Sequence, residues 1–418
     1  MHLALLGWLG CEDQGLVQLD PPIPTTTTTT PPTGTDVPTW QDVAPILEAR
    51  CLQCHLGEGP APMSLETYAS ARAWAPSIAV AVRERTMPPY LVDAGGDCQE
   101  FVDPGWLSEE EITTLEAWAE AGAPSGPSVE PLVGSPLARM DDPDVMLDIG
   151  VDFLPNESPD QYRCFITDPG LVTDRYLTGY DVFPGNPEIV HHVTLFTLDT
   201  PAAIRQAEAL DAEDPVPGYA CFGGAGVLQS RQITGWALGT PETWFPEGTG
   251  LLLYAGSRVV VEVHYHTHDG AEPDRSQVAL ALEDTVETEA EVVMFYDLSM
   301  SLAPGEADLP YSFAMDTQGL VGEPVPLTVW GVFPHMHERG RSIRLDDTRD
   351  GATTCLADVP RWDFNWQRSY FYREPIQLEP TDELRVSCRY DTSGDTEPVP
   401  FGESTEDEMC VFGALVTR

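Results

Sequence analysis

The sequence contains no lysine, and its basic residues are few. All 21 of them are arginines, set against 68 aspartates and glutamates, which gives a formal net charge of -47 at pH 7 over 418 residues. A surface this acidic repels phosphate backbones and anionic lipid headgroups, so we expect no nucleic-acid partner. The carboxylates are dispersed along the chain, which indicates a solvated surface rather than an acidic tail.

Long apolar runs are also missing, because no stretch beyond the N-terminus is long enough to span a bilayer. The opening residues, MHLALLGWLGCEDQ, resemble the end of a bacterial lipoprotein signal, with Cys11 as the lipidated residue. The alternative is an unstructured N-terminus with a stray cysteine. The tract PPIPTTTTTTPPTGT cannot bury a core and predicts an extended tether. This order of segments predicts an extracytoplasmic protein, either a cell-envelope lipoprotein tethered through Cys11 or a secreted one.

Residues 37–127 are expected to form a small all-α domain. WQDVAPILEARC carries apolar residues at helical spacing, and SEEEITTLEAWAEAGAP begins with Ser108 as an N-cap and ends near Gly122. Between them lies CLQCH, and C-x-x-C-H is the signature of c-type haem attachment. Cys51 and Cys54 would bond the porphyrin vinyl groups, and His55 would be an axial iron ligand.

A redox or zinc Cys-x-x-Cys motif is the alternative, but zinc would need a second ligand pair that this segment lacks. His55 is its only histidine, so we expect a methionine as the second axial ligand. Met87 in RTMPPY is the first candidate and Met63 in GPAPMSL is the runner-up. The arrangement resembles small cytochrome c domains and predicts haem c as a cofactor.

The remaining chain reads as short strands separated by Gly, Pro and Asp. The period-2 segments are DVMLDIGVDF, YRCFITD, EIVHHVTLFTL, LLLYAGSRVVVEVHYH, PLTVWGVFPHMH, DELRVSCRY and EMCVFGALV. They predict antiparallel sandwiches or barrels, interrupted only by a short helix at PAAIRQAEAL. About 280 residues exceed one ordinary sandwich, so two are expected, with a break at 283–291.

Seven of the nine histidines fall on these strands in three clusters: His191 and His192; His264, His266 and His268; His335 and His337. One such histidine is usually a core or surface residue, but three clusters favour a metal such as copper, zinc or iron. Adjacent strand residues point to opposite faces, so the first pair can serve one metal only if the strand is distorted locally. One ring would then bind through its nearer nitrogen and the other through its farther one.

These residues resemble the copper type II, ascorbate-dependent monooxygenases, a family that includes peptidylglycine α-hydroxylating and dopamine β-monooxygenases. The resemblance covers roughly residues 144–415 and rests on four motifs in order, helped by ITGWALGTPETWFPEGTGLLL before the second. The motifs are HH at His191 and His192, VHY around His264, H-x-H at His335 and His337 followed by Gly340, and DEMC around Met409.

The resemblance implies a mainly β fold, with two jelly-roll-like antiparallel β-sandwiches preceded by the small cytochrome c-like domain. The expected divisions are 1–36 leader and linker, 37–127 haem domain, 128–140 linker, 141–285 first copper sandwich and 286–418 second copper sandwich. The six cysteines outside the leader and the haem motif allow 15 pairings. Cys388 with Cys410 matches a family disulfide, Cys164 is expected to pair with Cys221, and Cys98 and Cys355 are left unassigned.

The resemblance also implies two coppers per chain. The first would take His191, His192 and His264 and pass one electron, while the second would take His335, His337 and Met409 and activate O2. A thioether ligand is soft and favours Cu(I), which suits the second role. His266 and His268 are expected to be surface residues or to support the ligands from outside the metal shell.

The implied reaction is hydroxylation of a substrate C–H bond with O2, using a one-electron donor that is ascorbate or cytochrome-like. Peptide-amidating members hold a substrate carboxylate with Arg, Asn and Tyr, where this chain has Phe333, Val411 and Gly413. We therefore expect a small neutral or apolar substrate, with electrons also reaching copper through the fused haem. The alternative functions are a non-catalytic haem/copper electron-transfer or copper-binding envelope protein and a β-sandwich adhesin.

Overall fold

The computed structural model describes residues 37–418, except for short gaps at 58–60, 62, 90, 94–95, 97, 103–104, 134–137, 159, 222, 268–271, 365, 403 and 405. The expected lipidation site Cys11, the Pro/Thr tract and His268 lie outside the described residues. The chain divides into two units, residues 1–37 and residues 38–418. Within the part described, no helix has both the length and the apolar character that crossing a bilayer requires.

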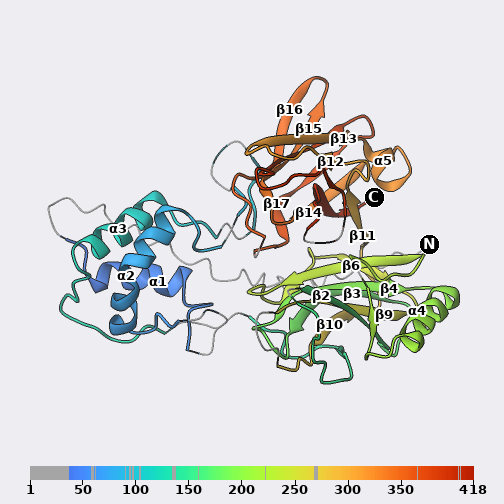
Figure 1. Cartoon of the computed structure of the whole chain (residues 1–418), viewed down its shortest axis with the longest axis horizontal. Coiled ribbons are helices and arrows are strands. Elements are labelled where there is room, and N and C mark those ends of the chain that lie inside the picture. Colours follow the sequence, from blue (N-terminus) through green and yellow to red (C-terminus); the bar gives the residue numbers. More distant parts are fainter. Residues whose placement is uncertain are drawn as a thin grey trace, which may run out of the picture. The chain divides into compact units, whose positions relative to one another are not determined.

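Three helices make up the N-terminal helical group: α1 (Trp40–Arg50), α2 (Tyr68–Arg83) and α3 (Glu109–Glu120) (Figure 1). Trp40, Val43 and Leu47 follow helical spacing along α1 and are buried in the core of this group. Ser108 caps α3, because its hydroxyl accepts from the Glu111 N–H while the Glu111 carboxylate accepts from the Ser108 N–H. The two helices predicted from the sequence are confirmed, and α2 is a third that no predicted segment covered.

The segment between α2 and α3 is fastened to the C-terminal part of the chain. Cys98 forms a disulfide with Cys355, and these are the two cysteines to which the sequence assigned no partner. Phe101 is 1% exposed and stacks on Tyr372, with ring centroids 5.1 Å apart. The N–H of Val102 also donates to a backbone carbonyl of the same strand at 2.9 Å. The helical group is therefore attached by a covalent bond and by core packing as well as by its linker.

Twenty strands form the rest, joined by α4 (Pro201–Glu213) and α5 (Thr317–Val321). The first ten are β1 (Val145–Asp148), β2 (Asp160–Thr167), β3 (Arg175–Phe183), β4 (Val190–Leu198), β5 (Tyr219–Ala220), β6 (Ser230–Ala237), β7 (Thr243–Trp244), β8 (Thr249–Leu253), β9 (Arg258–His266) and β10 (Gln277–Glu283). The others are β11 (Thr288–Phe295), β12 (Ser301–Leu302), β13 (Leu309–Met315), β14 (Leu327–His335), β15 (Gly340–Arg349), β16 (Ala352–Val359), β17 (Tyr370–Leu378), β18 (Glu383–Tyr390), β19 (Val399–Pro400) and β20 (Val411–Thr417).

One long sheet runs through both expected sandwiches. Its order is β1-β10-β3-β8-β11-β20-β14-β17, with β7 beside β3. A five-stranded sheet, β5-β2-β9-β4-β6, shares one apolar core with its first half. A four-stranded sheet, β13-β18-β15-β16, shares a second core with its other half. The fold is mainly β, as predicted, but the two halves are continuous through the long sheet.

Strand β20 shows how the halves are joined. Phe412, Ala414 and Val416 pack in the C-terminal core, whereas Leu415, between them, packs in the N-terminal core. Side chains alternate between the faces of a strand, so each face of β20 serves a different core. On the N-terminal side, β11 pairs in parallel with β8 across the expected break at 283–291. Sliding of one half against the other would break this ladder.

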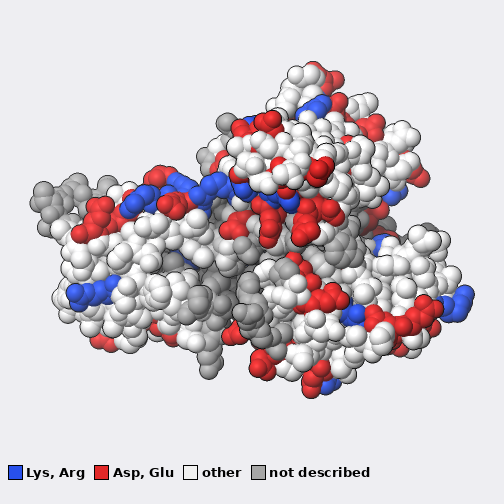
Figure 2. Space-filling view, in the orientation of Figure 1, with Lys and Arg blue, Asp and Glu red and all other residues white. Residues whose placement is uncertain are grey.

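The visible face of the molecule carries many acidic side chains (Figure 2). Figure 2 shows aspartate and glutamate side chains spread over the visible face, with arginines among them. Several arginines are ion-paired, such as Arg275 with Asp148 at 3.0 Å and Arg339 with Asp395 at 2.7 Å. Such a surface favours solubility and disfavours anionic partners.

Candidate copper sites and haem site

The first site is built by β4 and β9, which lie side by side in the five-stranded sheet. Their ladder shifts register between Val190 and His192, so β4 is distorted where the histidine pair begins. The Nδ1 atom of His192 lies 3.2 Å from Nδ1 of His191 and 3.2 Å from Nδ1 of His264. The predicted distortion is confirmed, and it allows two adjacent residues to face one point.

Electrostatics keep these three rings neutral. Burial lowers the pKa of His191 to about 3, and burial also lowers the pKa of His192 and of His264. A neutral imidazole has a free lone pair, which is the form that binds metal. The Nε2 atom of His191 is buried and has no hydrogen-bond partner. The orphaned nitrogen and the converging rings fit a metal ion such as copper.

Asp160 orients this site from outside the metal shell. One of its carboxylate oxygens lies 2.8 Å from Nε2 of His264 and 2.8 Å from Nδ1 of His266. His266 thus contacts the ligand set through a shared carboxylate, in the supporting position expected for it. A carboxylate behind a histidine ligand fixes its tautomer and ring orientation. Asp160 begins β2, and its spacing in the sequence carried no signal for this role.

The second site lies at the end of β14 and the start of β20. The ring centroids of His335 and His337 are 5.1 Å apart. Nδ1 of His335 lies 2.6 Å from Oε1 of Gln367, and Nδ1 of His337 lies 3.3 Å from the backbone oxygen of Asp407. Both contacts leave Nε2 of each ring available for a metal. Burial lowers the pKa of His335, and it lowers the pKa of His337 to about 3.

Met409 reaches the same cavity as these histidines, because Glu408 holds its backbone. One oxygen of the Glu408 carboxylate accepts from the N–H of His337 at 3.0 Å and of Met409 at 2.9 Å. The other oxygen accepts from the N–H of Arg339 at 2.8 Å. Glu408 is fully buried, and burial raises its pKa to about 7 although the three amides oppose that shift. Two imidazoles and a thioether fit Cu(I).

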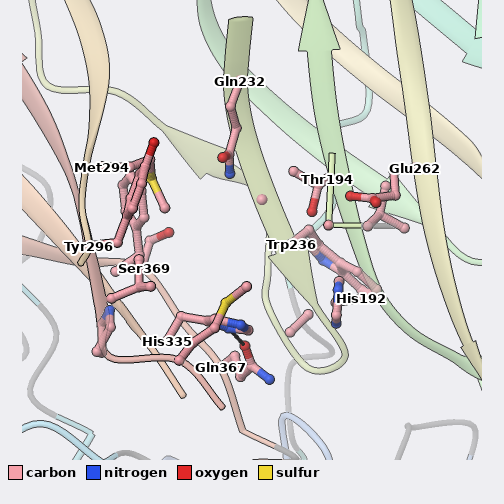
Figure 3. Close-up of a pocket in the computed structure, with 18 of the residues that line it drawn as sticks. His192, Thr194, Gln232, Trp236, Glu262, Met294, Tyr296, His335, Gln367 and Ser369 are labelled. Carbon is pink, nitrogen blue, oxygen red and sulfur yellow. Dashed lines mark hydrogen bonds between the residues drawn. The ribbon is translucent and has the colours of Figure 1, made fainter. Parts of the chain in front are cut away.

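A cavity of about 450 Å³ connects the two sites. His192 enters it from β4, and His335, His337 and Met409 enter it from the C-terminal half. Figure 3 shows His192, Thr194 and Glu262 on one side of the cavity and Met294, Tyr296 and His335 on the other. Half of the other lining residues are apolar: Val193, Phe196, Trp236, Ala237, Leu298, Phe333, Pro334, Phe401 and Val411. The other half includes the polar residues Gln232 and Gln367 and the cation Arg368.

Two of the residues that replace the carboxylate-binding set, Phe333 and Val411, line this cavity. The third, Gly413, lies beneath the ring of Phe333, and a Cβ on it would come 1.8 Å from Cε2 of that ring. The two positions are therefore coupled, since the aromatic ring occupies the space that any side chain at 413 would need.

The C-x-x-C-H turn follows α1. Cys51 and Cys54 are free thiols and half-buried, and burial raises the pKa of Cys51 to about 12. His55 is 8% exposed, and its Nδ1 lies 3.0 Å from the backbone oxygen of Met63. That contact leaves Nε2 for an axial bond, so the motif fits haem c. Pro88 and Pro89, directly after Met87, line a small cavity together with Cys54.

The structure contains both disulfides that were expected from the sequence. Cys388 pairs with Cys410 and Cys164 pairs with Cys221, as expected. The first of these bonds joins β18 to the residue after Met409, and it therefore holds the thioether strand in place. Three disulfides are typical of proteins from oxidising compartments.

Known proteins resemble this chain mainly over its β part. Residues 292–413 match the C-terminal domain of the copper type II ascorbate-dependent monooxygenases. A DBH-like monooxygenase protein 2 from Mus musculus is 27% identical over 54% of this chain and 38% of its own length. A tyramine beta-hydroxylase from Caenorhabditis briggsae is 26% identical over 55% of this chain and 40% of its own.

The dopamine beta-hydroxylase of Canis lupus familiaris is 23% identical over 72% of this chain and 50% of its own length. The chain thus spans about two fifths to one half of the length of these relatives. The matched C-terminal domain includes His335, His337 and Met409, and the alignments to whole relatives extend beyond it. The β part of the chain is therefore similar to the copper type II, ascorbate-dependent monooxygenases, whose C-terminal domain its residues 292–413 match.

Proposed function

We propose that this protein is a copper-dependent monooxygenase that hydroxylates a C–H bond of a small neutral or apolar molecule with O2. The observation that carries the proposal is the shared cavity, which His192 enters from one half and His335, His337 and Met409 enter from the other. Six side chains in two groups would hold the metals: His191, His192 and His264; His335, His337 and Met409. Copper at these positions would supply the one-electron steps and the activation of O2.

The protein's own contribution is to keep the ligands neutral, oriented and dry. Gln367 and the backbone oxygen of Asp407 fix the rings of the second site through Nδ1. Asp160 fixes the ring of His264 at the first site through Nε2. Glu408 keeps the backbone of the thioether ligand next to that of His337. Ligands held in this way need little rearrangement when substrate binds, which lowers the barrier.

The substrate class follows from the cavity wall. Phe333 and Val411 offer no charge to a carboxylate, and apolar side chains make up much of the wall, to which Arg368 adds one cation. Apolar contact and water exclusion would therefore hold the substrate, with Gln232 and Thr194 available for a neutral hydrogen bond.

The C-x-x-C-H turn supports haem c as a second source of electrons. Cys51 and Cys54 would form the thioether bonds, His55 would be the first axial ligand, and Met87 would be the second. An attached haem would deliver single electrons to the copper of the three-histidine site, with ascorbate or a cytochrome-like protein as the outside donor. The disulfides support an extracytoplasmic location, and we propose that Cys11 carries a lipid anchor.

The test is cofactor analysis of the full chain produced with haem maturation, followed by O2-uptake measurements. We expect two coppers and one haem per chain, and uptake stimulated by small apolar compounds but not by glycine-extended peptides. Met409→Ala should abolish stimulated uptake while the first copper stays bound. Met146→Ala, on an exposed side chain of β1, is the matched control and should retain uptake.

Three results would contradict the proposal in different ways. Copper and haem without substrate-stimulated uptake would favour the alternative of an electron-transfer protein. Absence of copper after reconstitution would favour a structural β module. Copper without haem would remove only the haem part.

A further inference from the structure

The loop between β16 and β17, residues 360–369, contacts all three candidate cofactor sites; we call it the three-site loop. Its sequence is PRWDFNWQRS, which is rich in aromatic and polar residues and matches no motif used above; Asn365 lies outside the described residues. Cys355, on the strand that leads into it, is bonded to Cys98 of the segment that follows α2. The disulfide therefore ties the strand before the loop to the segment that follows α2. The same strand also packs in the C-terminal core.

At the second copper site, the three-site loop contacts both histidines. Oε1 of Gln367 lies 2.6 Å from Nδ1 of His335. The indole N–H of Trp362 donates to the backbone oxygen of His337 at 3.2 Å. One loop therefore positions both imidazoles of the proposed O2 site.

Phe364 of the same loop lies between the two copper sites. Its ring stacks on His191, with centroids 5.0 Å apart and an interplanar angle of 24°. The same ring approaches His337 edge-on, with centroids 6.1 Å apart. A histidine of the first site and a histidine of the second therefore contact one aromatic side chain. The path between these two histidines therefore runs partly through an aromatic ring and not only through solvent.

At the haem-attachment turn, two further residues of the loop meet Cys54. Trp366 and Arg368 line a cavity of about 70 Å³ together with Cys54. The indole of Trp366 also packs near Gly239, where an added Cβ would lie 3.7 Å from its ring. Arg368 lines the large copper cavity as well, so it reaches both spaces.

Electron tunnelling weakens steeply with the length of any gap through empty space or solvent, and bonds, hydrogen bonds and packed rings shorten the effective gap. The three-site loop offers such a path. Arg368 is covalently adjacent to Gln367, which hydrogen-bonds a proposed ligand of the second site. Phe364 then connects that site to the first. From Arg368 onward each connection is a bond or a contact between neighbouring groups, and at the haem end Trp366 and Arg368 share a small cavity with Cys54.

We propose that the three-site loop is the electron route that joins the haem-attachment turn to both copper sites, with Trp366 and Arg368 at the haem end and Phe364 between the coppers. The inference rests on the proposed haem and copper content. In each step, one ferrous haem becomes ferric and one Cu(II) becomes Cu(I), with no atom transferred. A one-electron donor such as ascorbate then reduces the haem again.

The experiment measures electron transfer inside the oxidised holoprotein, without O2 or substrate. Flash photoreduction places one electron on the haem, and the haem absorbance then reports its re-oxidation. Freeze-quenched electron paramagnetic resonance reports the loss of Cu(II) at each site. A rate that does not depend on protein concentration identifies the intramolecular step.

We expect Trp366→Leu to slow haem re-oxidation at least several-fold. Phe364→Leu should leave haem re-oxidation near the wild-type rate but slow the sharing of the electron between the two coppers at least several-fold. Trp244→Leu is the matched control, because Trp244 is 52% exposed on β7 and lines neither cavity. If Trp366→Leu fails to fold, Arg368→Leu tests the same end of the loop.

The outcomes separate the two levels of the argument. Wild-type rates in both loop variants, with full haem and copper content, would overturn the three-site loop as the route and leave the proposed function intact. A wild-type protein without haem or without copper would instead overturn the proposed function, and the route would fall with it. Slowing in the loop variants but not in the control would support the route.

Discussion

Glu408 is a single buried carboxylate that organises the second copper site, and its removal gives the sharpest stability prediction. It is fully buried and accepts the backbone N–H groups of His337, Arg339 and Met409 at 2.8–3.0 Å. In Glu408→Ala, all three amides lose their acceptor. A buried donor without a partner costs about 1–3 kcal/mol, so the loss of unfolding free energy should be about 3 kcal/mol or more.

Glu408→Gln separates hydrogen bonding from volume. The amide keeps one oxygen, which can still accept from the pair formed by His337 and Met409, but its NH2 group then faces the N–H of Arg339. One donor is orphaned instead of three, so we expect a loss of about 1–3 kcal/mol. The free energy of unfolding should be lowest for Glu408→Ala, intermediate for Glu408→Gln and highest for wild type. This order indicates an acceptor role, because a simple packing role would leave the nearly isosteric Gln variant close to wild type.

Two assays check this prediction. Urea unfolding of the copper-free protein, with disulfides intact, gives the free energies of unfolding for the two variants and for Glu406→Ala, a control on an exposed carboxylate two residues earlier. Competition with a Cu(I) chelator should show roughly 10- to 100-fold weaker binding at the second site in the variants, because they loosen the ligand backbone. Unfolding free energies of Glu408→Ala within about 0.5 kcal/mol of wild type would refute the reasoning.

Three further predictions concern other parts of the molecule. Gly413→Ala should lower the free energy of unfolding by about 1–3 kcal/mol through its clash with Phe333, and adding Phe333→Ala should cost less than the two changes summed; strict additivity in a double-mutant cycle would contradict the coupling. Asp160→Asn should weaken copper binding at the first site by roughly 10- to 100-fold in a metal titration, whereas unchanged binding would mean that the carboxylate does not orient the ligands. Replacing Cys98 and Cys355 by Ser should cost about 2–5 kcal/mol and speed proteolysis between the helical group and the sheets, and equal cleavage rates would argue against the disulfide as a fastening.

The parts of the fold that the sequence predicted are those that leave a local pattern. Strand β9 is rich in β-branched valines up to His264, and the helix α3 is marked by its cap at Ser108. The histidine clusters stood out because imidazole is rare in this chain and was repeated on strands. Family resemblance, and not local pattern, predicted that Met409 and His335 contribute to the same site.

The parts that the sequence did not predict are long-range. The pairing of β11 with β8 depends on how two strands meet after folding, and period-2 patterns are the same for an edge strand and for a strand that joins two cores. Asp160 and Glu408 are two acidic residues among 68, and nothing in their spacing separates a buried acceptor from a solvated surface group. Burial and backbone hydrogen bonds distinguish Glu408, and contacts with two imidazoles distinguish Asp160. All of these need coordinates.

The three-site loop is the clearest case of this limit. Phe364 lies more than 170 residues from His191, so no local pattern connects them. Trp366 and Arg368 of the same short loop line a cavity together with Cys54 of the helical group. The bond from Cys98 to Cys355 then restricts that group to the neighbourhood of the loop, which raises the effective concentration of one partner for the other.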